Sequence, residues 1–118
     1  CSFEWVVHRN VCFYLSGPQE EGGWDWSQER CSARGASLVM ITRDWEMEFL
    51  MRLKGNVDYW LGLRRQGERL VWVDGSTFEE TFKVQGLGEC VYLNEDDVAS
   101  SSCSQSRPYI CSKPQALV

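Results

Sequence analysis

The sequence predicts one α+β domain stabilised by disulfides, and three observations lead to this expectation. The chain has 118 residues, enough for one hydrophobic core but too few for two ordinary domains. Helical periodicity is confined to the first half and strand-like segments fill the second half, which favours α+β over a doubly wound α/β sheet. Six cysteines at this density are typical of proteins that fold in an oxidising compartment.

Composition and charge exclude several classes of function. Hydrophobic residues make up 43% and charged residues 25% of the chain, as in ordinary soluble domains. A formal net charge of −5 fits neither a nucleic-acid-binding protein nor a domain that lies on anionic membranes. The apolar runs are far shorter than the roughly 20 residues that cross a bilayer. The start at Cys1, with no signal-peptide pattern, suggests an ectodomain whose anchor lies upstream.

The first elements expected are a hairpin and a helix. Residues 1–16 alternate loosely between apolar and polar around Arg9 and Asn10, which predicts a short hairpin. Asp25 and Gln28 have the spacing of a capping box and predict a helix over 26–34, which Gly35 ends.

A short buried segment and a second helix follow. The apolar run 37–41 predicts the buried segment, and a helix is expected from 42–44 to Lys54, with Gly55 as its stop. A stripe of apolar residues at helical spacing most simply packs on the core. These residues are Trp45, Phe49, Leu50 and Leu53.

Aromatic and β-branched residues in the second half predict strands. The first two strands should be joined by a polar loop, Arg64–Arg69, and 77–88 carries mixed signals that indicate a long irregular loop. The strand-like segments are 58–63, 70–73, 90–93 and 109–111.

The cysteines favour disulfides over a zinc site, because the chain has no Cys-x-x-Cys and a single histidine, His8. Six cysteines allow 15 pairings, and their spacing does not choose among them. Catalysis is not expected either. If every cysteine is paired, no thiolate nucleophile exists, and one histidine does not supply an acid–base–nucleophile set.

Blocks along nearly the whole chain resemble, in order, the C-type lectin-like domain. Within that family, the residues around Cys90 and Cys111 are similar to the natural-killer-receptor type, and most of all to the ligand branch of lectin-like transcripts and early activation antigens. The matching blocks are Trp26 with Cys31, Gly35–Val39, Trp60–Leu63, Trp72–Ser76, Gly88–Leu93 and Tyr109–Cys111.

The resemblance implies a fold and a cellular location. It implies the pairs Cys1–Cys12, Cys31–Cys111 and Cys90–Cys103, two helices with antiparallel sheets, neighbouring termini, and a long loop at about Thr77–Gly88. It also implies the extracellular domain of a type II membrane protein at the cell surface, commonly a homodimer. A disturbance of the first helix at Arg30 or Arg34 is expected to affect dimerisation rather than partner binding.

The calcium-dependent sugar site of that family is missing from this sequence. Members that have it carry Glu-Pro-Asn or Gln-Pro-Asp in the long loop and Trp-Asn-Asp before the fifth cysteine. Here no proline lies between Trp72 and Cys103, and Ser100–Ser102 precede that cysteine as apparent turn residues. No metal or cofactor is therefore expected. The acidic run Asn94–Asp97 is either an adventitious calcium site, a contact for a basic partner, or simply a solvated turn between strands.

Without a metal or catalytic set, function is expected on exposed loops as binding to a protein, another lectin-like receptor. Calcium-independent glycan binding is the alternative, but mixed arginine, glutamate and phenylalanine favour a protein partner. The residues expected to contact the partner are Arg64, Arg65, Arg69, Phe78, Glu79, Glu80, Phe82, Lys83, Gln85, Glu95, Asp96 and Asp97.

Simpler interpretations exist for several of these residues. Phe78 and Phe82 would serve equally well to anchor the long loop on the core. Arg64, Arg65 and Arg69 would also suit a solvated hairpin loop. For binding, the resembled fold implies that the three loops converge at the end of the domain opposite the termini.

Overall fold

The chain begins with the predicted hairpin in the computed structural model, which describes residues 1–116. β1 (Val6–His8) and β2 (Val11–Leu15) pair antiparallel. Arg9 and Asn10 between them have φ of 49° and 67°, the left-handed conformation that two-residue hairpin turns require. The arginine is unusual in that conformation, whereas asparagine tolerates it.

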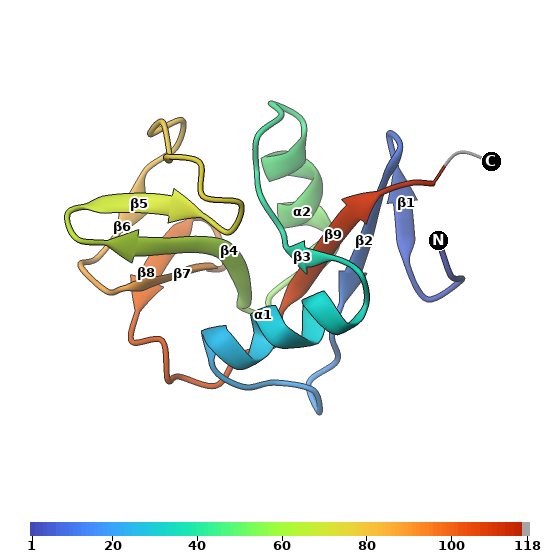
Figure 1. Cartoon of the computed structure of the whole chain (residues 1–118), viewed down its shortest axis with the longest axis horizontal. Coiled ribbons are helices and arrows are strands. Elements are labelled where there is room, and N and C mark those ends of the chain that lie inside the picture. The colour runs from blue at the N-terminus through green and yellow to red at the C-terminus, as the bar shows by residue number, and fades with distance from the viewer. Residues whose placement is uncertain (117–118) are drawn as a thin grey trace.

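The hairpin belongs to a four-stranded sheet in the order β1-β2-β9-β3. β9 (Ile110–Pro114) lies between β2 and β3 (Ser37–Leu38) and is antiparallel to both. Figure 1 shows the consequence: the last strand runs back beside the first hairpin, so the beginning and end of the fold are neighbours. The expectation of adjacent termini is thus confirmed for the described residues.

Helix α1 (Trp24–Ala33) begins two residues earlier than expected, and the predicted capping box is wrong. Gly23 is the N-cap residue and no side chain caps the helix. The carboxylate of Asp25 instead pairs with Arg64, and Oε1 of Gln28 accepts a hydrogen bond of 2.9 Å from the main-chain N–H of Leu38. Both side chains of the predicted capping box, Asp25 and Gln28, therefore bind residues elsewhere in the fold.

Helix α2 (Glu46–Lys54) begins later than expected because of a buried carboxylate. Glu46 is 1% exposed, and its Oε1 accepts hydrogen bonds from the main-chain N–H groups of Thr42 and Arg43 at 3.1 and 2.9 Å. These bonds hold the preceding turn outside the helix. The predicted glycine stops are confirmed, since Gly35 and Gly55 follow α1 and α2 with φ of 71° and 65°.

The second sheet has five strands in the order β5-β4-β7-β8-β6, and it corrects three expectations. The supposed polar loop 64–69 is a continuous hairpin with a two-residue turn at Gly67 and Glu68. The supposed irregular loop contains a short strand, and Ser100 and Ser101 lie in a strand rather than a turn. The strands are β4 (Tyr59–Gln66), β5 (Arg69–Trp72), β6 (Val84–Gln85), β7 (Cys90–Leu93) and β8 (Val98–Ser101).

The core has two parts, one on each side of the second sheet. The larger part contains Leu50 of α2 and the alternate β4 residues Leu61 and Leu63. The smaller part surrounds Trp60 and two of the disulfides. All three expected pairs are present, Cys1–Cys12, Cys31–Cys111 and Cys90–Cys103. Neither helix of the described chain is long and apolar enough to cross a bilayer.

Candidate functional site

The β4–β5 hairpin and the start of the following loop enclose a pocket of about 310 Å³, which we call the hairpin pocket. It lies in the part of the fold farthest from the first sheet, at the left of Figure 1. The hairpin contributes two arginines and a glutamate to the pocket, and the loop contributes two glutamates. Its lining residues are Arg65, Glu68, Arg69, Leu70, Thr77, Phe78, Glu79 and Glu80.

Arg65 is held by the main chain but keeps its charge available. Its main-chain N–H donates to the carbonyl of Glu89 at 2.7 Å, and its Nε donates to the carbonyl of Gly88 at 3.2 Å. Within residues 1–116, no carboxylate forms an ion pair with Arg65 or with Arg69. The terminal nitrogens of an oriented guanidinium are well suited to bind a carboxylate in bidentate geometry.

Arg64 has a different role, although it is the next residue along β4. Neighbouring residues of a strand point to opposite faces, and Arg64 lies over the ring of Trp24, 5.2 Å from its centre. Its guanidinium pairs with Glu89 and with Asp25. The hydrogen bond to Glu89 is the main cause of a raised pKa for Arg64. The sequence analysis treated both arginines as candidate partner contacts, whereas in the structure Arg64 forms ion pairs within the domain.

The long loop is anchored by aromatic rings. Phe78 is 8% exposed, and its ring lies 4.7 Å from that of Phe82 and 5.9 Å from that of Trp72. The anchoring interpretation therefore holds for Phe78, whose small exposed part lines the hairpin pocket. Glu80 has a φ of 55°, which is uncommon for a residue with a side chain. The anchored loop thus presents Glu79 and Glu80, both exposed, beside the hairpin.

The acidic turn Asn94–Asp97 does not join this pocket. β4 pairs with β7 so that Tyr59 faces Leu93 and Arg64 faces Cys90. The turn that follows Leu93 therefore lies beside the start of β4, whereas Arg65 lies near its end. The expected convergence of three loops is wrong for this turn, because the strand order places it at the other end of the sheet.

The turn instead neighbours the end of α2. The Nζ of Lys54, a buried side chain, donates to the carbonyl of Val57 at 2.8 Å. Burial lowers the pKa of Lys54, while the charges of Asp58, Glu95 and Asp96 oppose that shift. Asp97 accepts a hydrogen bond of 2.6 Å from Gln85. These contacts agree with the interpretation of 94–97 as a turn between two strands, and in the described chain no three His, Cys, Asp or Glu side chains gather as metal ligands do.

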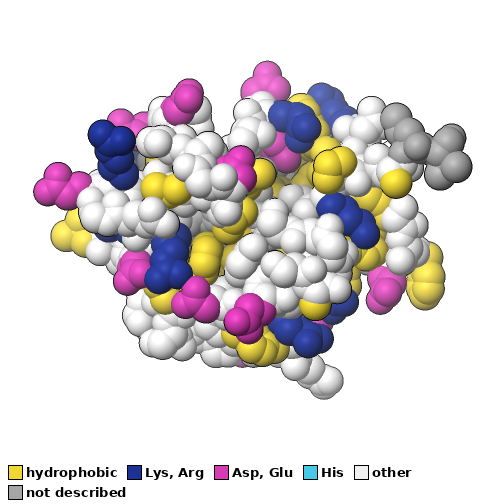
Figure 2. All heavy atoms as spheres, viewed as in Figure 1, with side chains coloured by type: hydrophobic (Ala, Val, Ile, Leu, Met, Phe, Trp, Pro, Cys, Tyr) yellow, Lys and Arg dark blue, Asp and Glu magenta, His cyan; other side chains and the backbone are white. Residues whose placement is uncertain are grey.

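Lys83 is exposed and precedes β6, and Phe82 is partly buried. Figure 2 shows that basic and acidic side chains are interspersed on this face of the molecule rather than collected into a field of one sign. Such mixed charge is suited to protein recognition and does not suit binding to polyanions.

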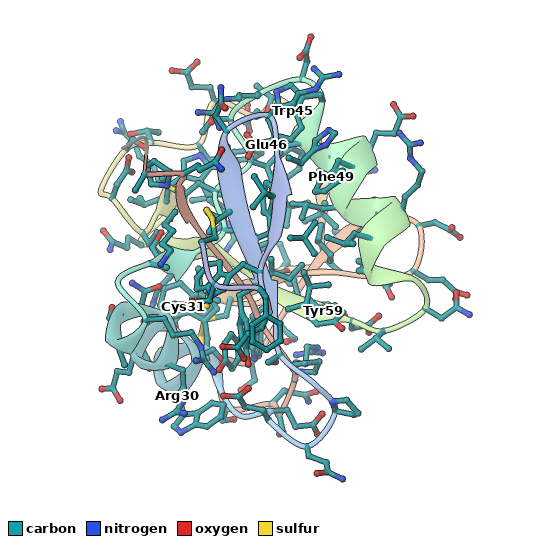
Figure 3. All side chains as sticks on the ribbon, turned by 90° about the vertical axis from the view of Figure 1, so that its right-hand side faces the viewer. Arg30, Cys31, Trp45, Glu46, Phe49 and Tyr59 are labelled. Atoms are coloured by element: carbon teal, nitrogen blue, oxygen red, sulfur yellow. A yellow bond between two sulfur atoms is a disulfide. The ribbon has the colours of Figure 1, made fainter. Side chains whose placement is uncertain are left out.

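A second surface was missed in the sequence. The stripe of α2 was assigned to the core, and Trp45 and Phe49 do pack against it, but of the four residues only Leu50 is buried, and Trp45, Phe49 and Leu53 remain partly exposed. They face the β1–β2 hairpin across a groove of about 480 Å³, which we call the α2 groove, and Figure 3 shows Trp45 and Phe49 projecting toward that hairpin. His8 stacks on Phe49 with ring centres 4.2 Å apart. The groove is lined by His8, Arg9, Trp45, Glu48, Phe49, Arg52 and Leu53.

Arg30 and Arg34 of α1 are engaged within the domain. Both form ion pairs with Glu20, at 3.5 and 3.0 Å, and Arg34 lies 4.0 Å from the ring centre of Tyr14. Burial and a hydrogen bond to Glu20 raise the pKa of Tyr14 to about 12. The cluster joins the loop before α1 to the first sheet, so a change at Arg34 is expected to reduce stability.

Comparisons with known proteins agree with this fold and identify the family of the chain. The model of the "Lectin C-type domain" family matches residues 20–113. Human C-type lectin domain family 2 member B is 40% identical over 96% of this chain and 75% of its own length. Human early activation antigen CD69 is 34% identical over 97% of this chain and 57% of its own length. The chain thus spans only part of these relatives.

Solved structures support the same conclusion at the level of the fold. The carbohydrate-recognition domain of mouse scavenger receptor C-type lectin superposes with a TM-score of 0.86 at 22% sequence identity, covering 100% of this chain and 99% of that one. The family model covers most of the chain, and the sequence relatives exceed 30% identity. The chain therefore belongs to the C-type lectin domain family, among relatives that include the family 2 members and early activation antigen CD69.

Proposed function

We propose that this domain is a cell-surface immune ligand or receptor that binds a lectin-like protein on natural killer cells or related leukocytes, without calcium, through the hairpin pocket. The observation that carries the proposal is the pair Arg65 and Arg69, which have no ion-pair partner in residues 1–116 yet share a pocket with Glu79 and Glu80. Charges of both signs, presented by an anchored loop and a hairpin, can steer encounter and set specificity.

The relatives support the cellular setting. Similarity to C-type lectin domain family 2 members and to an early activation antigen favours an extracellular immune domain. The three disulfides favour an oxidising compartment. We extend the proposal to a type II membrane protein that presents the hairpin pocket away from the membrane, because the two ends of the described chain lie at the opposite side of the fold (Figure 1).

Reversing Arg65 to Glu, or Glu80 to Lys, is expected to weaken binding to the cognate receptor at least tenfold, about 1.4 kcal/mol. Each change places a like charge where the partner presents an opposite one. The measurement is surface plasmon resonance against a panel of lectin-like receptor ectodomains of the same species, with calcium and again with chelator. Affinity is expected to be the same in both buffers.

The matched control is Glu29→Lys, which makes the same change as Glu80→Lys on the exposed face of α1. It should leave affinity unchanged. If Glu29→Lys weakened binding while Arg65→Glu did not, the partner would bind the α1 face of the domain and not the hairpin pocket. A strong signal on a glycan array, with no receptor bound, would instead establish a glycan-binding function.

We further propose that the α2 groove is the contact between two copies of this chain in a homodimer. The groove combines partly exposed aromatic surface with Arg9 and the Glu48–Arg52 ion pair, and a two-fold axis would bring the same patch of each copy together. β1 beside it is the edge of its sheet, with Val6 38% and Val7 46% exposed. An exposed apolar edge of this kind is typically covered by a partner.

The dimer should dissociate when a charge is placed in the groove. Leu53→Glu is expected to convert the protein to a monomer in sedimentation velocity at micromolar concentration, because the carboxylate loses its hydration on burial. Val57→Glu is the control, since Val57 is 44% exposed and lies outside the groove. Unchanged sedimentation of Leu53→Glu as a dimer, or a monomeric wild type, would contradict the proposal.

A further inference from the structure

Leu87 stands out on the surface because almost nothing in the domain covers it. Its side chain is 95% exposed, and among the large hydrophobic residues described only Phe3 is more exposed. A single exposed leucine needs no explanation in itself. What distinguishes Leu87 is the loop that carries it and the residue beside it.

The loop is held rigidly against β8. The N–H of Gly88 donates to Oγ of Ser100 at 3.0 Å, and that hydroxyl donates to the carbonyl of Gln85 at 2.9 Å. Gly86 has a φ of 85°, which favours glycine. A Cβ atom on Gly88 would overlap the main chain of Ser101. The chain on each side of Leu87 is therefore fixed, and Leu87 itself is held out into solvent.

Arg65 is attached to this loop. Its Nε donates to the carbonyl of Gly88, the residue after Leu87, at 3.2 Å, and its main-chain N–H donates to Glu89 at 2.7 Å. The bond at Nε orients the guanidinium, and its terminal nitrogens have no hydrogen-bond partner in residues 1–116. An oriented guanidinium is thus bound to the main chain one residue after the exposed Leu87.

We propose that Leu87 and Arg65 form one anchor, in which Leu87 enters an apolar depression of a protein partner while Arg65 binds a carboxylate at its rim. This inference rests on the proposed function and assigns a chemistry to the partner. The partner presents a carboxylate at this position because Arg65 and Arg69 have no ion-pair partner in the described chain. We infer a protein rather than a polyanion, because the chain has a formal net charge of −5 and Leu87 offers apolar surface.

The physical argument is one of preorganisation. A loop whose main chain is already held by hydrogen bonds loses little backbone entropy on binding, so more of the interaction energy appears as affinity. Desolvation by a neighbouring apolar contact strengthens a charge-assisted hydrogen bond, since water no longer competes for it. The two contacts should therefore depend on each other.

The test uses the receptor ectodomain that binds best in the panel described above. Leu87→Ala is expected to weaken affinity at least tenfold, mostly through faster dissociation. Arg65→Lys keeps the charge but lacks the fork that binds a carboxylate with two nitrogens, and it is also expected to lose affinity. The double variant should lose less than the sum of the two single losses in free energy.

Phe3→Ala is the matched control, because Phe3 is 99% exposed and remote from Arg65 in the fold. It should leave affinity unchanged, and neither Phe3→Ala nor Leu87→Ala should shift the melting temperature, because both side chains are exposed. Equal losses for Phe3→Ala and Leu87→Ala would indicate nonspecific adhesion and overturn the anchor. Loss with Arg65→Glu but not with Leu87→Ala would overturn it while the proposed function stands. If no receptor in the panel binds, both fall.

Discussion

Replacing both Cys31 and Cys111 with alanine is expected to lower the free energy of unfolding by about 4–5 kcal/mol. The two cysteines are 80 residues apart and join α1 to β9. Without the bond, the unfolded chain regains the entropy of a long open loop, and that entropy grows with loop length. Both cysteines are fully buried in the smaller part of the core. The measurement is denaturant unfolding followed by circular dichroism.

The Cys90–Cys103 pair is the natural comparison. Its two cysteines are 13 residues apart, so its removal is expected to cost about 3 kcal/mol by the same estimate. The order of the two losses is the informative result. If removal of Cys31–Cys111 left stability at the wild-type level, this disulfide would not be a major support of the fold.

Trp60→Ala is expected to cost about 3–5 kcal/mol, the range for removing a large buried aromatic ring. Trp60 is completely buried, and its Nε1 donates to the carbonyl of Gly22 at 2.8 Å. Its ring packs edge-on against Tyr92, with centres 6.0 Å apart. The substitution opens a cavity between α1 and the second sheet and removes one of two hydrogen bonds to the Gly22 carbonyl, which still accepts from the main-chain N–H of Arg107 at 3.0 Å.

Trp60→Phe separates these two contributions. It retains most of the ring but cannot donate to Gly22, whose carbonyl still accepts from Arg107, so a loss of roughly 0.5–1.5 kcal/mol is expected for the hydrogen bond. A loss below about 1 kcal/mol for Trp60→Ala would mean that the surrounding side chains collapse into the space. Receptor affinity should follow the folded fraction only, because Trp60 has no surface to offer a partner.

The hairpin pocket and the α2 groove show which features could not be predicted from the sequence. The sequence predicted a polar loop with candidate contact residues at 64–69, whereas its extension as a hairpin depended on pairing with β7. From the sequence alone, Arg64 and Arg65 could not be assigned different roles. Strand geometry requires that they point to opposite faces, yet it does not state which face meets α1 and which meets the long loop.

The α2 stripe illustrates a different difficulty. Helical spacing correctly placed Trp45, Phe49 and Leu53 on one side of α2, and that side does face the rest of the domain. How deeply they are buried depends on how closely the β1–β2 hairpin approaches, which is set by its pairing with β9. A periodic pattern predicts on which side of a helix a residue lies, but it does not predict how deeply neighbouring elements bury that residue.

Features that depend on neighbouring residues were determined by the sequence itself. The glycine stops at Gly35 and Gly55 and the turn at Arg9 and Asn10 follow from backbone conformation within a few residues. The disulfide pairing came from the resemblance to a family, because spacing alone left every pairing open. Both kinds of expectation are confirmed in the described residues.

Tertiary structure alone decided which charges are free. Arg64 is neutralised by Glu89 and Asp25, which lie 25 and 39 residues away along the chain. Arg65 is oriented by a carbonyl 23 residues away and has no ion-pair partner in the described chain. Electrostatic and hydrogen-bond partners act through space over a few ångströms, whatever their separation in sequence. Only the folded arrangement of strands could therefore place Arg65 beside Leu87 and move the acidic turn to the far end of the sheet.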